Sequence, residues 1–130
     1  MLTDITIRNT ERSDFGQIID LCHDVFPFCT AWTLSQLTSH VGNFPEGQFV
    51  AVDERSSRIA GMSANLIVDW DDYPEELTWR DIMDRGFFTN HNPEGRTLFG
   101  ADMLVHPDMG DRGVREGLYR ARGNLVRERS

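Results

Sequence analysis

Residues 97–129 read TLFGADMLVHPDMGDRGVREGLYRARGNLVRER, and this stretch decides the fold. It predicts an apolar strand from Leu98 to Val105, a proline stop at Pro107 and a tight loop over residues 108–113. A helix follows, because apolar residues then recur at i, i+4, i+7 and i+11 and form one stripe. The residues of this stripe are Val114, Leu118, Ala121 and Leu125.

A strand that leads through a glycine-containing loop into a helix is a common device for binding phosphate. The first N–H groups of a helix have no acceptor within the helix, and the helix dipole is positive there. Glycine lets the backbone approach the anion closely. Two phosphate loops are excluded here: the P-loop requires a lysine, which the chain lacks, and the GxGxxG dinucleotide motif is absent.

The loop resembles the pyrophosphate loop of the GNAT superfamily of acetyl-CoA-dependent N-acetyltransferases. In that family a strand ending in Val-x-Pro precedes an (Arg/Gln)-x-x-Gly-x-(Gly/Ala) loop and a helix. Residues 105–107 (Val-His-Pro), Gly113 and the aliphatic Val114 match this pattern. Two positions depart from it, since Gly110 replaces the usual Arg or Gln and Arg115 replaces the second Gly or Ala.

Three further segments resemble one GNAT branch, in which the domain occurs alone or is joined to a carbon–nitrogen hydrolase domain. They are FPEGQFVAVD (44–53), SANLIVDWDDY (63–73) and FFTNHNPEGRTLFGADMLVHPD (87–108). The similarity runs from about Ile5 to the end of the chain. The hydrolases of this branch use a Glu-Lys-Cys set, so a chain without lysine is not expected to carry that activity.

The resemblance implies a site for acetyl-CoA as co-substrate. Its pyrophosphate would be bound by backbone N–H groups of Gly110, Asp111, Arg112, Gly113, Val114 and Arg115. Its pantetheine arm and the reacting carbonyl would lie along the strand at Leu104 and Val105. Asp102, the one carboxylate in the apolar strand, is a candidate general base, and His106 beside the loop is a second candidate. For each of them, an ordinary strand or loop position remains the alternative.

Composition also bears on the partners, the location and the metal content that we expect. A net charge of −8 argues against nucleic acid or an anionic membrane as partner, although six arginines follow Met109. The chain has two cysteines, Cys22 and Cys29, and no signal-like or membrane-spanning segment, so we expect a cytoplasmic protein with reduced thiols. Cys22, His23 and Cys29 lack the spacing of a metal site, and no metal is expected.

The first half of the chain predicts alternating strands and helices. A strand at residues 4–8 leads into a helix that starts at 10–14 and ends at Pro27. Thr33 and Gln36 form a capping box for a second helix. We expect this helix to bury Leu34, Leu37 and Val41.

The second half begins with a strand at 48–52, a turn at 54–57 and a strand at 59–70, whose alternation predicts one buried face. A short helix is predicted around 78–83. The acidic residues between 69 and 76 would either attract a cationic amine or form a solvated loop, and His91 would either line the acceptor site or belong to a turn.

These elements predict a single domain over residues 1–130 of mixed α/β (α+β) class, with a mainly antiparallel sheet flanked by helices in the order β-α-α-β-β-(α)-β-α. The GNAT fold continues with a fifth strand, so we expect a C-terminally shortened form of it. The strand at 98–105 would then have an open edge, where a second copy or another partner could pair.

The sequence therefore predicts an N-acyltransferase that passes acetyl from acetyl-CoA to an amine acceptor. The alternative is a non-catalytic module that binds acyl-CoA weakly or contacts a protein through its open sheet edge. Arg115 and the missing fifth strand favour the module, whereas the Val-x-Pro strand and Gly113 favour the enzyme.

Overall fold

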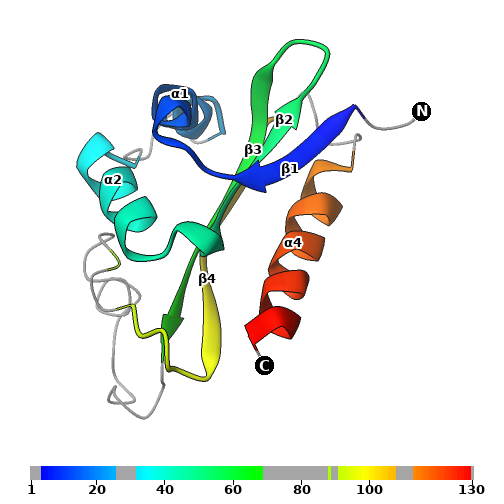
Figure 1. Ribbon diagram of the computed structural model, residues 1–130. Helices are drawn as coiled ribbons and strands as arrows, with labels where there is room; N and C mark the ends of the chain where they lie inside the picture. The colour runs from blue at the N-terminus through cyan, green and yellow to red at the C-terminus, as the bar shows by residue number, and fades with distance from the viewer. Residues whose placement is uncertain (1–3, 26–31, 69–87, 89–90, 108–112, 130) are drawn as a thin grey trace.

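The computed structural model describes residues 4–25, 32–68, 88, 91–107 and 113–129. Figure 1 shows a sheet with helices α1 and α2 on one face and helix α4 on the other. The strands are β1 (Ile5–Asn9), β2 (Gln48–Asp53), β3 (Arg58–Val68) and β4 (Thr97–Val105). The helices are α1 (Phe15–Val25), α2 (Leu34–Asn43) and α4 (Val114–Arg129), with short 3-10 turns at Arg12–Asp14 and Pro45–Gly47.

The four strands lie in the order β1-β2-β3-β4, and every neighbouring pair is antiparallel. The predicted fold class is therefore confirmed. Among the described residues β4 pairs with β3 alone, so its other edge faces no strand, as the sequence led us to expect. The predicted helix around residues 78–83 lies outside the described residues.

β3 is buried on both faces, and the prediction of a single buried face was wrong. Met62 and Leu66 pack in the core beneath α1 and α2, whereas Ala60 on the opposite face packs against Val114 and Leu118 of α4. Both faces of β3 are buried because helices cover both sides of the sheet, so a strand in the central layer of three has no solvated face.

α2 begins with the predicted capping box. The Gln36 N–H donates to the Thr33 hydroxyl (3.1 Å), and the Thr33 N–H donates to the Gln36 side chain (2.9 Å). Leu34 was predicted to be buried but is 60% exposed, because it occupies the first helical position and its side chain points back past the helix end. His40 is buried instead, at 1% exposure, and stacks on Phe88 with ring centroids 3.6 Å apart.

Two side chains complete the hydrogen bonding of β3 where it runs beyond the start of β2. The Gln48 amide donates to the carbonyl of Asn65 (2.7 Å) and accepts from its N–H (3.3 Å). Further on, the Ile67 N–H donates to Nδ1 of His91 (2.9 Å), and the Asn92 N–H donates to the Ile67 carbonyl (2.7 Å). These contacts place His91 against β3, in keeping with its turn interpretation.

β1 is joined to the start of α1 by an ion pair. The Arg8 guanidinium donates to both carboxylate oxygens of Asp14 at 2.7 and 2.8 Å, and the carboxylate also accepts the N–H of Glu11 (2.8 Å). Burial alone would raise the pKa of Asp14, but the hydrogen bonds from Arg8 and Glu11 outweigh it and lower that pKa.

Asp14→Asn is expected to lower the free energy of unfolding by about 2 kcal/mol at pH 7, because the hydrogen bonds to a charged carboxylate are lost. Since the folded pKa of Asp14 is lowered, its contribution is complete above the ordinary pKa of about 3.9 and disappears as pH falls through the folded value. Denaturant unfolding from pH 7 to pH 2 measures both effects. Asp20→Asn, at an exposed position of α1, is the control. An equal gap between wild type and Asp14→Asn at every pH would contradict this account.

Candidate functional site

A β-bulge in β4 decides which way its carboxylate points. Ala64 of β3 pairs with Asp102 and Asn65 pairs with Gly100, so Ala101 is an extra residue in β4. As a result both Ala101 and Asp102 face the core beneath α1, whereas Gly100 faces α4. Bulges often re-aim a side chain beside an active site, and this one directs Asp102 toward α1.

Asp102 is held in place by two donors. The Trp32 indole N–H donates to Oδ2 (3.0 Å), and the Met103 backbone N–H donates to Oδ1 (3.0 Å). Burial raises the pKa of Asp102, and these two hydrogen bonds offset only part of that effect. The carboxylate therefore lies in a partly desolvated pocket and is a stronger base than an exposed aspartate.

The thiol of Cys22 lies in the same pocket. Burial raises its pKa, a backbone hydrogen bond from Trp32 opposes this, and the negative charge of Asp102 raises it further. Cys22 is a buried residue of the core, and Trp32 was not among the site residues predicted from the sequence. Trp32 could have been identified from the general rule that a buried tryptophan usually needs an acceptor for its N–H.

His106 lies on the same face of β4 but apart from Asp102. Its backbone N–H donates to the Ala60 carbonyl (2.8 Å), and its Nε2 lies 3.4 Å from Oδ2 of Asp24 at the end of α1. His106 follows the end of β4 and is four positions along the chain from Asp102, which corresponds to roughly 13 Å in extended backbone. The structure therefore does not bring the two candidate catalytic residues together.

The start of α4 offers the backbone donors that a phosphate needs. Gly113 has φ = 77°, and its carbonyl accepts the first helical hydrogen bond, from Gly117 (3.0 Å). The N–H groups of Val114, Arg115 and Glu116 precede that bond and have no acceptor within the helix. Arg115 is exposed. Residues 110–112, also predicted to bind the cofactor, lie outside the described residues.

Two close contacts set the position of this helix end. A Cβ on Gly61 of β3 would lie 2.7 Å from Cγ1 of Val114 and 2.8 Å from the Leu104 carbonyl oxygen. A glycine at this position therefore allows α4 to begin directly over the ends of β3 and β4. Leu104 is buried toward α1, and Val105 packs on the α4 side of the sheet. The predicted pantetheine strand and the free helix N–H groups are thus adjacent, an arrangement that fits the diphosphate and arm of coenzyme A.

Other features of the described residues lie away from this site. A hollow of about 580 Å³ lies between the last turns of α4 and residues 93–98, with Leu98, Leu125 and Val126 in its wall. It is roughly 16 Å along the helix from Val114. The described part of the chain contains no group of three His, Cys, Asp or Glu residues placed to hold a metal ion. None of its helices is long and apolar enough to cross a bilayer.

Two relatives are known from Bacillus subtilis (strain 168). The protein named "Probable hydrolase YhcX" is 42% identical over 123 residues, which are 95% of this chain and 24% of that protein. The protein named "Uncharacterized N-acetyltransferase YkwB" is 36% identical over 107 residues, which are 79% of this chain and 46% of that protein. The chain thus spans about a quarter of one relative and just under half of the other. No family model matches it.

Solved structures with the same fold are GNAT-like domains. The loading GNATL domain of CurA from Lyngbya majuscula superposes with a TM-score of 0.69 at 15% identity, over 89% of this chain and 55% of that one. The GphF GNAT-like decarboxylase in complex with isobutyryl-CoA has a TM-score of 0.67 at 18% identity, over 89% and 58%. The resemblance to GNAT domains is therefore confirmed at the level of the fold.

Trp32→Phe is expected to raise the pKa of Asp102 further, because the indole donor that stabilises the carboxylate is removed while the aromatic packing is retained. Titration of the ¹³C carboxyl resonance in wild type and variant measures the shift, and Asp102→Asn identifies the resonance. An unchanged or lower pKa in Trp32→Phe would show that the indole does not stabilise the charged form.

Gly61→Ala is expected to destabilise the fold by about 1–3 kcal/mol, since the new methyl group overlaps Val114 and a backbone carbonyl. Gly42→Ala is the matched control, because a Cβ there meets nothing within 4 Å and alanine favours the α2 helix by up to about 1 kcal/mol. Thermal unfolding of both variants measures the contrast. Equal shifts of Tm would mean that the start of α4 does not depend on this contact.

Proposed function

We propose that this chain, whose fold is that of GNAT-like acetyltransferase domains, transfers an acyl group from a coenzyme A thioester to an amine. The observation that carries the proposal is the start of α4, where Gly113 has a positive φ and three helix N–H groups lie beside the end of β4. Acetyl-CoA is the proposed co-substrate.

The proposed reaction forms a C–N bond and breaks the C–S bond of the thioester. The ammonium group of the acceptor loses two protons: the departing thiolate takes up one of them, and the other is released to solvent. The chain must therefore supply a base, and Asp102 suits that role because burial raises its pKa and two donors fix its position. Backbone groups at Leu104 and Val105 are proposed to orient the arm and to stabilise the oxyanion.

His106 is the second candidate for proton transfer. Its Nε2 faces the carboxylate of Asp24, and it lies between the bulge of β4 and the residues that lead to α4. A carboxylate partner holds an imidazole in one orientation. We propose that His106 acts only on protons at this end of the site, because its distance along the strand from Asp102 excludes a direct relay.

The relatives support acyl transfer in general terms. One carries the name of an N-acetyltransferase, and the GphF structure holds an acyl-CoA. The same fold is also found in a decarboxylase, so the fold alone does not determine the reaction. The acceptor amine, a cytoplasmic location and pairing of a second copy along the open edge of β4 remain predictions.

Asp102→Asn is expected to lower kcat for acetylation of an amine substrate by about 100-fold or more, because amide replaces the proton acceptor. The Kd for acetyl-CoA should not change, since Asp102 faces α1 and not the start of α4. A turnover assay over a panel of amines, with calorimetry for acetyl-CoA, measures both. Asp20→Asn is the exposed control.

The alternatives give different results in these two measurements. Normal acetyl-CoA binding without turnover would indicate a non-catalytic acyl-CoA-binding module. Gly113→Val should weaken acetyl-CoA binding by roughly tenfold or more, because a β-branched side chain at positive φ distorts the turn that exposes the amides. No heat of binding at high acetyl-CoA concentration would overturn both cofactor-based functions.

A further inference from the structure

Arg122 differs from the other described arginines in having a buried nitrogen without a partner. Its Nε has essentially no solvent exposure and no hydrogen-bond partner. Within the described residues Arg122 forms no ion pair, whereas Arg8 pairs with Asp14 and Arg55 pairs with Asp4. A buried, unsatisfied donor of a charged group is costly, so its retention calls for an explanation.

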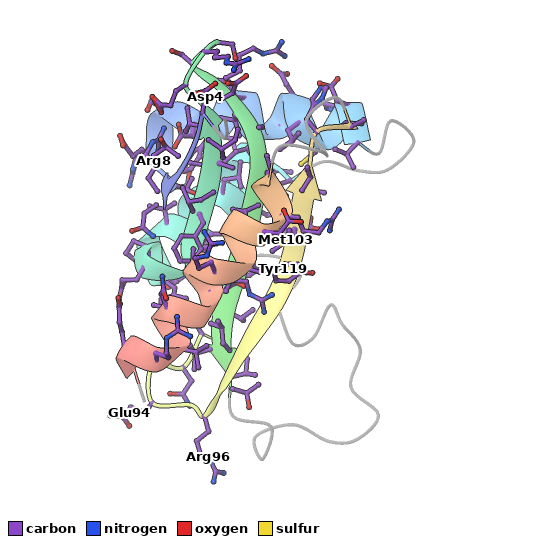
Figure 2. All side chains as sticks on the ribbon, turned by 90° about the vertical axis from the view of Figure 1, so that its right-hand side faces the viewer. Asp4, Arg8, Glu94, Arg96, Met103 and Tyr119 are labelled. Atoms are coloured by element: carbon purple, nitrogen blue, oxygen red, sulfur yellow. The ribbon has the colours of Figure 1, made fainter. Side chains whose placement is uncertain are left out.

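The guanidinium lies close to β4 at a position that is occupied by glycine. A Cβ on Gly100 would lie 2.7 Å from Nη2, 3.0 Å from Cζ and 3.3 Å from Nη1 of Arg122. Any larger residue at position 100 would displace the group. Tyr119, one turn back on α4, provides a second contact, with its ring centroid 5.9 Å from Cζ. Figure 2 shows Tyr119, which is 52% exposed, where α4 borders β4.

This position is next to the proposed reaction centre. Gly100 and Asp102 flank the bulge residue Ala101, so Arg122 lies on the α4 side of the same bulge whose other side carries Asp102. The start of α4 is eight residues from Arg122, roughly 12 Å along the helix, so a diphosphate bound there does not reach the guanidinium. An anion bound at Arg122 would therefore belong to the acyl group or to the acceptor.

An open hollow adjoins the Arg122–Gly100 contact. Leu98, Leu125 and Val126 line this hollow. Leu125 and Val126 follow Arg122 by one turn of α4, and Leu98 precedes Gly100 by two residues of β4. A planar guanidinium with free donors is suited to a carboxylate, which accepts two parallel N–H bonds.

We propose that Arg122, placed by Gly100, is a specificity-determining residue that binds a carboxylate of the substrate. This inference rests on the proposed acyl transfer and names its substrate class: either a dicarboxylic acyl-CoA thioester or an amine acceptor that carries a carboxylate.

The first arm of the test compares succinyl-CoA with butyryl-CoA, which has the same chain length and no acyl charge. If the acyl group supplies the carboxylate, wild type binds succinyl-CoA at least tenfold more tightly, and Arg122→Gln removes this preference without changing the affinity for butyryl-CoA. Gly100→Ala should also remove it, because the new Cβ displaces the guanidinium. Arg122→Lys should keep part of it, and Arg120→Gln, at an exposed position of α4, should keep all of it.

The second arm compares amino-acid acceptors with the corresponding amines lacking the carboxylate, at saturating acetyl-CoA. If the acceptor supplies the carboxylate, Arg122→Gln raises KM at least tenfold for the amino acids alone and leaves kcat for the simple amines unchanged. A loss of selectivity in either arm supports the proposal and identifies the source of the carboxylate.

Equal behaviour of Arg122→Gln and wild type in both arms, with normal acetyl-CoA binding, would overturn the carboxylate site and leave the proposed function intact. Failure of wild type to bind any of the three thioesters would overturn the proposed function, and the carboxylate site with it. Circular dichroism and thermal unfolding of each variant distinguish lost selectivity from lost structure.

Discussion

The pairing of β3 with β4, with one extra residue at Ala101, is the constraint on which the site depends. Strict alternation would place Gly100 and Asp102 on the same face of the sheet. The bulge reverses the alternation, so that Asp102 enters the pocket of Trp32 while Gly100 stays under α4. The extra residue Ala101 thus places the Asp102 carboxylate in a partly desolvated environment and leaves the opposite face of β4 at Gly100 open to the Arg122 guanidinium.

α4 packs on the sheet through an apolar face and through close approaches at two glycines. Gly61 allows Val114 to approach the backbone of β3, and a Cβ on Gly117 would lie 3.0 Å from the Ile7 side chain. These contacts fix the first turn of the helix at the end of β4. Because helix N–H groups bind an anion only where they point, the same packing that stabilises the domain also orients the proposed phosphate site.

The sequence predicted the elements well because their signals are local. The capping box of Thr33 and Gln36 predicted the start of α2, and the apolar stripe from Val114 predicted α4. The details of the site depend on contacts between distant segments. Trp32 and Asp102 are 70 residues apart in the sequence, so their hydrogen bond could not be predicted from local periodicity. The bulge at Ala101 could not be predicted either, because no sequence pattern in the strand indicates it. Burial of β3 on both faces likewise became visible only once helices were seen on both sides.

The two faces of β4 carry opposite charges for related reasons. On the α1 side the protein surrounds Asp102 with apolar groups and supplies only two donors, which leaves the carboxylate basic. On the α4 side it holds a guanidinium against bare backbone and supplies no carboxylate of its own among the described residues. Leaving each charge incompletely compensated costs stability. This cost supports the proposal that β4 has a proton acceptor on one face and an anion-binding group on the other, on either side of one reacting centre.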